Sequence, residues 1–136
     1  MILKRITLTS LAIAAMLLSG TTNVFAAEKE TPIFLFGLSR SLNDSTVYMT
    51  EIQLISTAEI DTKTKFLQNR EKYSEQLTEY LEKIGVNYPT TVTEYSTSRN
   101  KAEKKFLKLR NKFMREGGFE LKIVTTDSFQ YNPLEK

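Results

Sequence analysis

The 136-residue sequence contains neither cysteine nor histidine. Without cysteine the chain can form no disulfide, so a domain of this size must be stabilised by packing alone. The two absences together also exclude thiol nucleophiles, imidazole bases and the usual zinc ligands. No cofactor is therefore predicted, although a metal site built only from oxygen ligands is compatible with the composition.

Glycine is also scarce, with five residues, and a glycine-rich phosphate loop of the Walker or dinucleotide type is missing, which argues against ATP-driven chemistry. Serine catalysis without histidine would need a lysine base. Ser98 and Lys101 have the required spacing, but they lie at an expected helix start, where Ser98 is better explained as a cap. Carboxylate pairs for glycoside hydrolysis are assembled in space, so an enzyme is disfavoured rather than excluded.

The beginning of the chain reads as a secretory signal. Lys4 and Arg5 form a charged region, residues 6–18 an apolar run, and residues 24–26 supply the small side chains that signal peptidase recognises. A membrane anchor would need about 20 apolar residues, and threonine and serine already interrupt this shorter run. The sequence therefore predicts a signal peptide over 1–26 and an exported chain, located in the periplasm or secreted.

The same region also bears on two other possibilities for the mature chain, a lipid anchor and a nucleic-acid partner. Residues 17–20 look like the start of a lipoprotein box, but Thr21 stands where lipidation requires a cysteine. No lipid anchor and no transmembrane span after processing are therefore expected, and residues 27–136 should form a single domain. Loss of Lys4 and Arg5 leaves 17 cationic against 16 acidic residues, so net charge gives no argument for a nucleic-acid partner.

The first half of the mature chain predicts a β-hairpin followed by a helix. Residues 33–38 are continuously apolar, as in a central strand covered on both sides or one that is closely approached at Gly37. Residues 46–55 read as the second strand, after a turn at 43–45. A capping box at 56–59 and a helix over 62–84 should follow, with Phe66 at the centre of its apolar face.

The second half predicts a strand, a helix and a strand. Gly85 fits the end of the first helix, residues 90–95 form a third strand, and a serine or threonine at 96–98 caps a helix that runs to about residue 116. Residues 119–123 alternate between apolar and charged, which is typical of a half-buried strand. The expected fold is an α+β two-layer sandwich, with a four-stranded, largely antiparallel sheet and both helices on one face.

Both predicted helices carry a row of like charges opposite the apolar face. The acidic row of the first helix consists of Glu71, Glu75, Glu79 and Glu82. The basic row of the second consists of Lys101, Lys104, Lys108 and Arg115, with Lys105 and Lys112 on its flank. Such rows are usually solvated helix faces, but the basic row is also a candidate surface for an anionic partner.

Two arginines interrupt the apolar sectors of these helices. Arg70 lies about 40° from Phe66, and Arg110 lies about 40° from Phe106, by the helical advance per residue. Each guanidinium should therefore be partly covered and need a carboxylate or carbonyl partner. A structural ion pair is the simpler interpretation, and a shared anion site beneath the helices is the functional one.

The predicted hairpin loop combines hydroxyl, carboxylate and guanidinium groups. Ser39, Arg40, Ser41 and Asp44 could together bind a sugar or a peptide by hydrogen bonds. The same residues are also common in turns. They are candidate ligand contacts with that structural alternative.

Several segments resemble small exported proteins of gut-type gram-negative anaerobes. The resemblance rests on residues 37–39, 44–48, 62–67 with Arg70, and 104–110, and it spans most of the mature chain. It implies export and one compact domain, and the family brings no assigned activity or binding residues.

We therefore expect an exported, noncatalytic envelope domain that binds a protein or an anionic envelope polymer. Two alternatives stay open: a small carboxylate-dependent glycan or peptide hydrolase, and a secreted inhibitor or interaction factor that presents the hairpin loop or a sheet edge. A deep pocket with two carboxylates would favour the hydrolase. The sequence leaves the oligomeric state and the partner's identity open.

Overall fold

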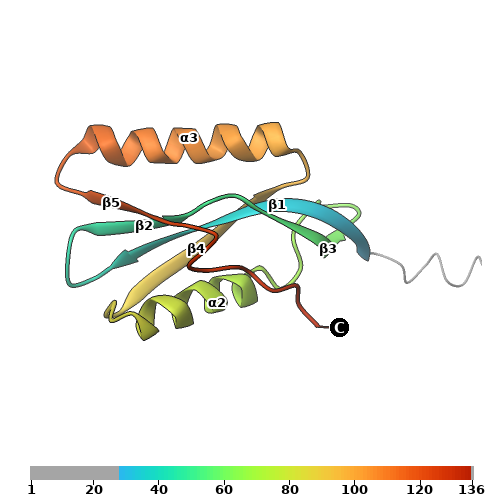
Figure 1. The fold of residues 1–136 in the computed structure, drawn as a ribbon. Helices are drawn as coiled ribbons and strands as arrows, with labels where there is room; N and C mark the ends of the chain where they lie inside the picture. The colour runs from blue at the N-terminus through green and yellow to red at the C-terminus, as the bar shows by residue number, and fades with distance from the viewer. Residues whose placement is uncertain (1–27, 136) are drawn as a thin grey trace, which may run out of the picture.

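The computed structural model describes residues 28–135, so the predicted signal segment lies outside the described residues. The elements of this range are β1 (Glu28–Ser41), β2 (Thr46–Thr50), β3 (Gln53–Asp61), α2 (Arg70–Lys83), β4 (Pro89–Ser96), α3 (Arg99–Glu116) and β5 (Glu120–Val124) (Figure 1). The α+β class and the mostly antiparallel sheet are confirmed, with five strands in place of four. No helix of residues 28–135 is long and apolar enough to span a bilayer.

β1 is the centre of the sheet. β4 pairs along one of its edges, while β2 and β3 follow each other along the opposite edge, all antiparallel to β1. β5 then pairs in parallel with β2. The predicted hairpin is thus present between β1 and β2, but its second strand is divided in two and β3 continues to Asp61. The region 56–59, predicted as a capping box, is part of this strand.

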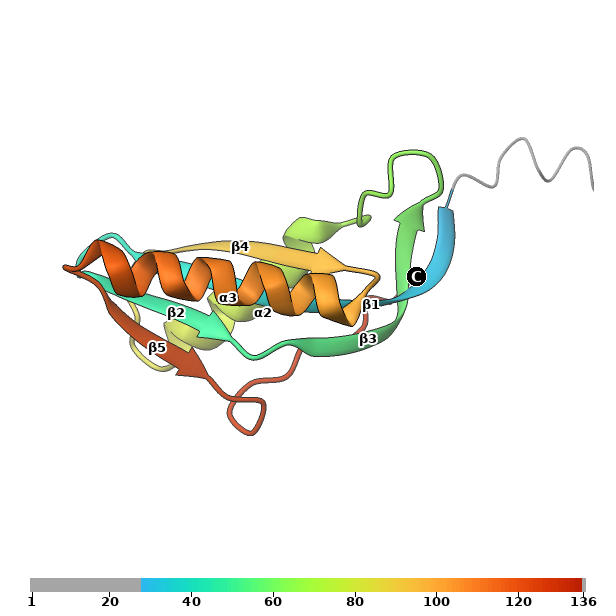
Figure 2. The same cartoon turned by 90° about the horizontal axis from the view of Figure 1, so that it is seen from above.

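The two helices lie on opposite faces of the sheet, so the prediction of one shared face was wrong (Figures 1 and 2). The reason is that β1 carries apolar side chains on both of its faces. Ile33 and Leu35 belong to the core beneath α2, whereas Phe36 belongs to a second core with Phe113 of α3. A strand that is apolar on both faces needs a covering layer on each.

α2 begins eight residues later than predicted, because residues 62–69 form a turn. Asp61 Oδ1 accepts hydrogen bonds from the backbone N–H groups of Lys63, at 2.8 Å, and Thr64, at 3.0 Å. These N–H groups, Thr64 first, hold the pKa of Asp61 below its usual value. Phe66, expected at the centre of the buried face, is 66% exposed, and Tyr73, Leu77 and Leu81 form that face instead.

β1 begins five residues before and ends three residues after the predicted strand 33–38. Ser39, Arg40 and Ser41, predicted in the hairpin loop, therefore belong to the strand.

The boundaries of the other elements agree with the sequence prediction. Gly85 has φ of 95° at the end of α2, as a left-handed helix end requires. Ser98 caps α3, since its side chain accepts from the backbone N–H of Lys101. α3 ends before Gly117, whose φ of 67° stops the helix. β4 and β5 lie within one residue of their expected positions.

Residues 125–135 follow the last predicted strand and form a segment for which the sequence predicts no element. This segment runs beside α2 beneath the sheet (Figure 1) and adds Phe129 and Tyr131 to the core there. Two glutamine side chains hold its backbone. Gln53 donates to the carbonyl of Phe129 and accepts from the N–H of Tyr131, and Gln76 makes the same pair of bonds with Asn132.

Candidate functional site

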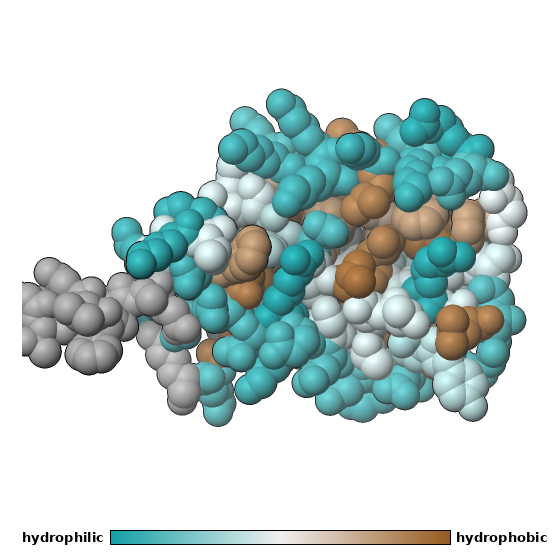
Figure 3. Space-filling model, turned by 180° about the vertical axis from the view of Figure 1, so that it is seen from behind, coloured by the Kyte–Doolittle hydropathy of each residue, from teal (hydrophilic) through white to brown (hydrophobic). Residues whose placement is uncertain are grey.

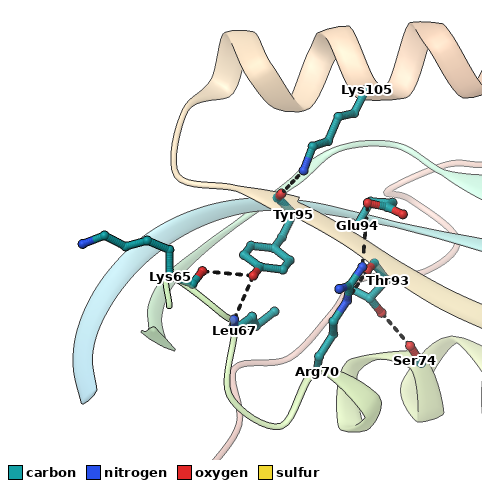
Figure 4. Close-up of polar contacts among 8 residues, drawn as sticks. All are labelled: Lys65, Leu67, Arg70, Ser74, Thr93, Glu94, Tyr95 and Lys105. Atoms are coloured by element: carbon teal, nitrogen blue, oxygen red, sulfur yellow. Dashed lines mark hydrogen bonds and ion pairs between the residues drawn. The ribbon is translucent and has the colours of Figure 1, made fainter. Parts of the chain in front are cut away.

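Polar and charged side chains gather at the outer edge of β4 (Figure 4). In an antiparallel pair, alternate residues direct their N–H and C=O groups toward the partner strand. The N–H of Gly37 donates to the Thr50 hydroxyl, away from β4. Since Gly37 is opposite Thr93, the backbone groups of Thr93 and its alternate neighbours, Thr91 and Tyr95, point outward from the sheet.

Two cationic side chains cap carbonyl groups on this edge. Arg70, the first residue of α2, donates from Nε to the Thr93 carbonyl at 2.6 Å, and Lys105 of α3 donates from Nζ to the Tyr95 carbonyl at 3.0 Å. A helix on each face of the sheet therefore contributes one cation to the same strand edge (Figure 4). Charged side chains of this kind are a common protection against unwanted strand pairing.

Tyr95 connects this edge to the turn before α2. Its ring lies 5.3 Å from the Arg70 guanidinium carbon and 5.8 Å from Lys105 Nζ, which places a cation near the aromatic ring from each helix. Its hydroxyl accepts from the N–H of Leu67 at 2.9 Å and donates to the carbonyl of Lys65 at 3.0 Å. Neither Tyr95 nor Lys105 was a predicted site residue at this edge.

Hydroxyl groups fasten α2 to β4 and β1. Ser74 shares a 2.7 Å hydrogen bond with Thr93, and Thr78 donates to Thr91, which in turn donates to Ser39. Ser39 is buried in this seam. It was predicted as a ligand contact, and the structure gives its hydroxyl a partner within the protein. The alternating threonines of β4 are the sequence signal that could have indicated the seam.

The other hairpin residues lie around a groove of about 550 Å³ between the hairpin tip, β4 and α3. Arg40, Ser41 and Asp44 line it together with apolar side chains, namely Leu38, Leu42, Val92 and Phe113. The Ser41 hydroxyl donates to the carbonyl of Asn87, and Asp44 accepts from the N–H of Thr46, so both also stabilise turns. Arg40 lies over the Phe119 ring at 4.6 Å.

The anion site proposed for Arg70 and Arg110 is not assembled. Arg70 donates to the Thr93 carbonyl of β4 and lies 3.7 Å from the Glu94 carboxylate, so it has partners of both kinds expected for it. Arg110 is exposed on α3, on the opposite side of the sheet. The buried sector of α3 is centred on Ala102 and Phe113, so Phe106 marks its border and a residue 40° beyond Phe106 faces solvent.

The outward side of α3 is strongly basic. It presents the predicted row of Lys101, Lys104, Lys108 and Arg115, all exposed. Between these cations and Arg110 lie two exposed apolar residues, Leu107 (48%) and Met114 (60%), one heptad apart on the same side of the helix. We call the six residues Lys101, Lys104, Leu107, Lys108, Met114 and Arg115 the basic face.

A separate cavity of about 330 Å³ has two glutamates among its lining residues. Glu59 of β3 and Glu135 line it, along with Asn69 and the buried Tyr73. Burial raises the pKa of the Tyr73 phenol above its ordinary value. No group of three or more acidic residues in the described range is arranged to hold a metal ion.

Comparison with known proteins gives no relative from which a role could be transferred. No family model, curated protein or solved structure matches the chain.

Proposed function

We propose that this protein is an exported, noncatalytic domain that binds an anionic polymer or an acidic protein of the cell envelope through the basic face of α3. The observation that carries the proposal is the separation of charge. α3 has eight lysines and arginines against two glutamates. The rest of residues 28–135 has eight cations and fourteen anions, so a nearly neutral domain has one strongly positive side.

The position of the helices supports this interpretation. Because α2 and α3 lie on opposite faces, the acidic row of α2 and the basic face point in opposite directions (Figure 1). An approaching anionic surface would therefore attract α3 and repel α2, which orients the domain before contact. Leu107 and Met114 would enter the contact as apolar groups between the cations, as on interfacial helices.

Vesicle binding tests the proposal directly. Lys101→Glu/Lys104→Glu/Lys108→Glu should weaken binding to phosphatidylglycerol vesicles and to envelope fractions by at least about a hundredfold, since each cation near an anionic surface contributes about 1 kcal/mol. A matched control reverses three exposed cations outside α3, Lys63, Lys72 and Lys83, with the same change in net charge. Equal binding by both triple variants and the parent would end the proposal.

The hydrolase alternative would use the cavity that Glu59 and Glu135 line. The charge separation of α3 is the stronger observation, and it favours binding over hydrolysis.

A further inference from the structure

We infer that the free edge of β4 binds an extended acidic peptide segment as an added antiparallel strand, with the peptide's apolar side chains in the adjoining groove. The inference deepens the proposed function, because it uses the positive charge of α3 and names the partner class as an acidic polypeptide. It concerns a different surface from the basic face, so the inference and the proposed function can be refuted separately.

Within residues 28–135, the outward-pointing backbone groups of β4 are unpaired in the first half of the strand, whereas carbonyls in the second half accept hydrogen bonds from cationic side chains. Arg70 and Lys105 occupy the carbonyls of Thr93 and Tyr95. Neither backbone group of Thr91 is bonded by another part of residues 28–135, and its N–H and C=O both point outward. The N–H of Thr93 points the same way. An added strand could therefore pair with Thr91 on both groups, and the two cations set where pairing stops.

The groove lies beside this unpaired first half of β4. Side chains of β4 alternate between the faces of the sheet: Thr91 contacts Thr78 of α2, whereas Val92 lines the groove with Phe113 of α3. Val92 is 46% exposed and Leu42 is 77% exposed. Figure 3 shows apolar side chains gathered on this side of the molecule, between the hydrophilic surfaces above and below. In an added strand, every second side chain would enter the groove.

Charge complementarity indicates what the partner carries. Lys105 and Arg70 flank the edge, where the Glu94 carboxylate lies 3.7 Å from Arg70, and Arg40 and Asp44 line the groove, so three cations stand against two acidic groups. A second copy of this chain is a poor partner. Antiparallel pairing of two β4 edges would place both α3 helices on the same face of the joined sheet, each with an excess of six positive charges. An acidic segment meets no such repulsion.

Titration of the ¹⁵N-labelled protein with the probe peptide acetyl-Asp-Leu-Thr-Val-Thr-Glu-Glu-amide tests the inference. The amide signals of Thr91 and Thr93 should shift on binding. In the antiparallel arrangement, the peptide residues that direct N–H groups to β4 have side chains on the α2 face, which are the threonines. N-methylation of the two threonines should weaken binding at least about tenfold, while N-methylation of leucine and valine should not.

Protein variants provide a second test of the inference. Val92→Glu and Leu42→Glu change exposed side chains at the groove, and each should weaken peptide binding at least about tenfold. Leu54→Glu is the matched control, since Leu54 is an exposed leucine of β3 away from the groove. Vesicle binding should persist in Val92→Glu, which separates this inference from the proposed function.

Three results would overturn the inference: a dissociation constant above about 1 mM for the probe, equal binding by the threonine-methylated peptide, or amide shifts confined to α3. Dimerisation of the free protein through β4 would also overturn it, because a second copy would then be the occupant. Loss of vesicle binding in the α3 variant alongside unchanged edge binding would overturn only the proposed function.

Discussion

Gly37 has no side chain, and this leaves room for two other side chains. A Cβ atom at this site would collide with Tyr131 Oη and Leu77 Cδ2. A close approach at Gly37 was one of two alternatives for this strand, and the approaching groups are side chains of α2 and of residues 125–135 rather than backbone. Gly37→Ala should destabilise the fold by about 1–3 kcal/mol through overpacking, measured by urea unfolding. The cost should be smaller in a Tyr131→Phe background, and equal costs in both backgrounds would contradict this origin.

Tyr131 is buried with a hydroxyl that has no well-formed hydrogen bond within residues 28–135, although the Thr50 hydroxyl lies near it. Burial raises the pKa of this phenol far above its ordinary value. Tyr131→Phe should therefore leave stability at pH 7 unchanged or raise it by up to about 1 kcal/mol, since no hydrogen bond is lost.

The same phenol predicts a pH dependence. Below about pH 10 tyrosine is protonated in both folded and unfolded chains, so its contribution is constant. Above about pH 10 the unfolded chain loses the proton and the folded chain keeps it, so stability should fall as pH rises. Chemical unfolding at several alkaline pH values should show a smaller fall in Tyr131→Phe than in the parent. Parallel curves would show that Tyr131 is not responsible.

At the scale of elements, the two glutamine clamps on residues 125–135 differ in burial. Gln53 is buried, and its loss leaves the N–H of Tyr131 and the carbonyl of Phe129 without partners. Gln53→Ala should lower the free energy of unfolding by about 2–4 kcal/mol, because each buried polar group left without a hydrogen-bond partner costs about 1–3 kcal/mol. Gln76→Ala, at the more exposed clamp, should cost less than about 1 kcal/mol, since water replaces the lost bonds. Equal unfolding midpoints would refute this distinction.

Elements whose limits depend on local chemistry were predictable from the sequence. Ser98, Gly85 and Gly117 mark helix ends through capping and left-handed backbone, which neighbouring residues determine. The start of α2 was not predictable by periodicity, because Asp61 organises a turn that competes with helix from Thr62 onward. Phe66 then falls outside the helix for which it matched the apolar face.

The spatial arrangement of the helices around the sheet was harder to predict from the sequence. The continuous apolar run of β1 indicates a covering layer on both faces, whereas a two-layer fold predicts both helices on one face. The candidate site depended on that placement. Arg70 is the first residue of α2, Arg110 lies within α3, and the sheet separates the two helices. Tyr95 and Lys105 meet Arg70 only because β4 lies between α2 and α3, which no spacing along the chain reveals.

At the scale of the whole molecule, charge separation predicts salt-sensitive binding. The Debye length falls from about 10 Å at 0.1 M salt to about 3 Å at 1 M. Vesicle binding through the basic face should therefore weaken steeply over this range, whereas apolar contacts of Leu107 and Met114 should resist salt. Sedimentation with phosphatidylglycerol vesicles at increasing NaCl measures the effect. Binding that is independent of salt would contradict an electrostatic contact.

The segment 125–135 also has a consequence for the timing of folding. Phe129 and Tyr131 complete the core against β1, the first strand of the described chain. Contacts between residues so distant in sequence form late and slow the folding of small domains. A chain still emerging from a ribosome cannot close this core until residues 125–135 are free. The core should therefore reach its final packing only after this segment has emerged, and the earlier strands and helices should be only partly formed until then.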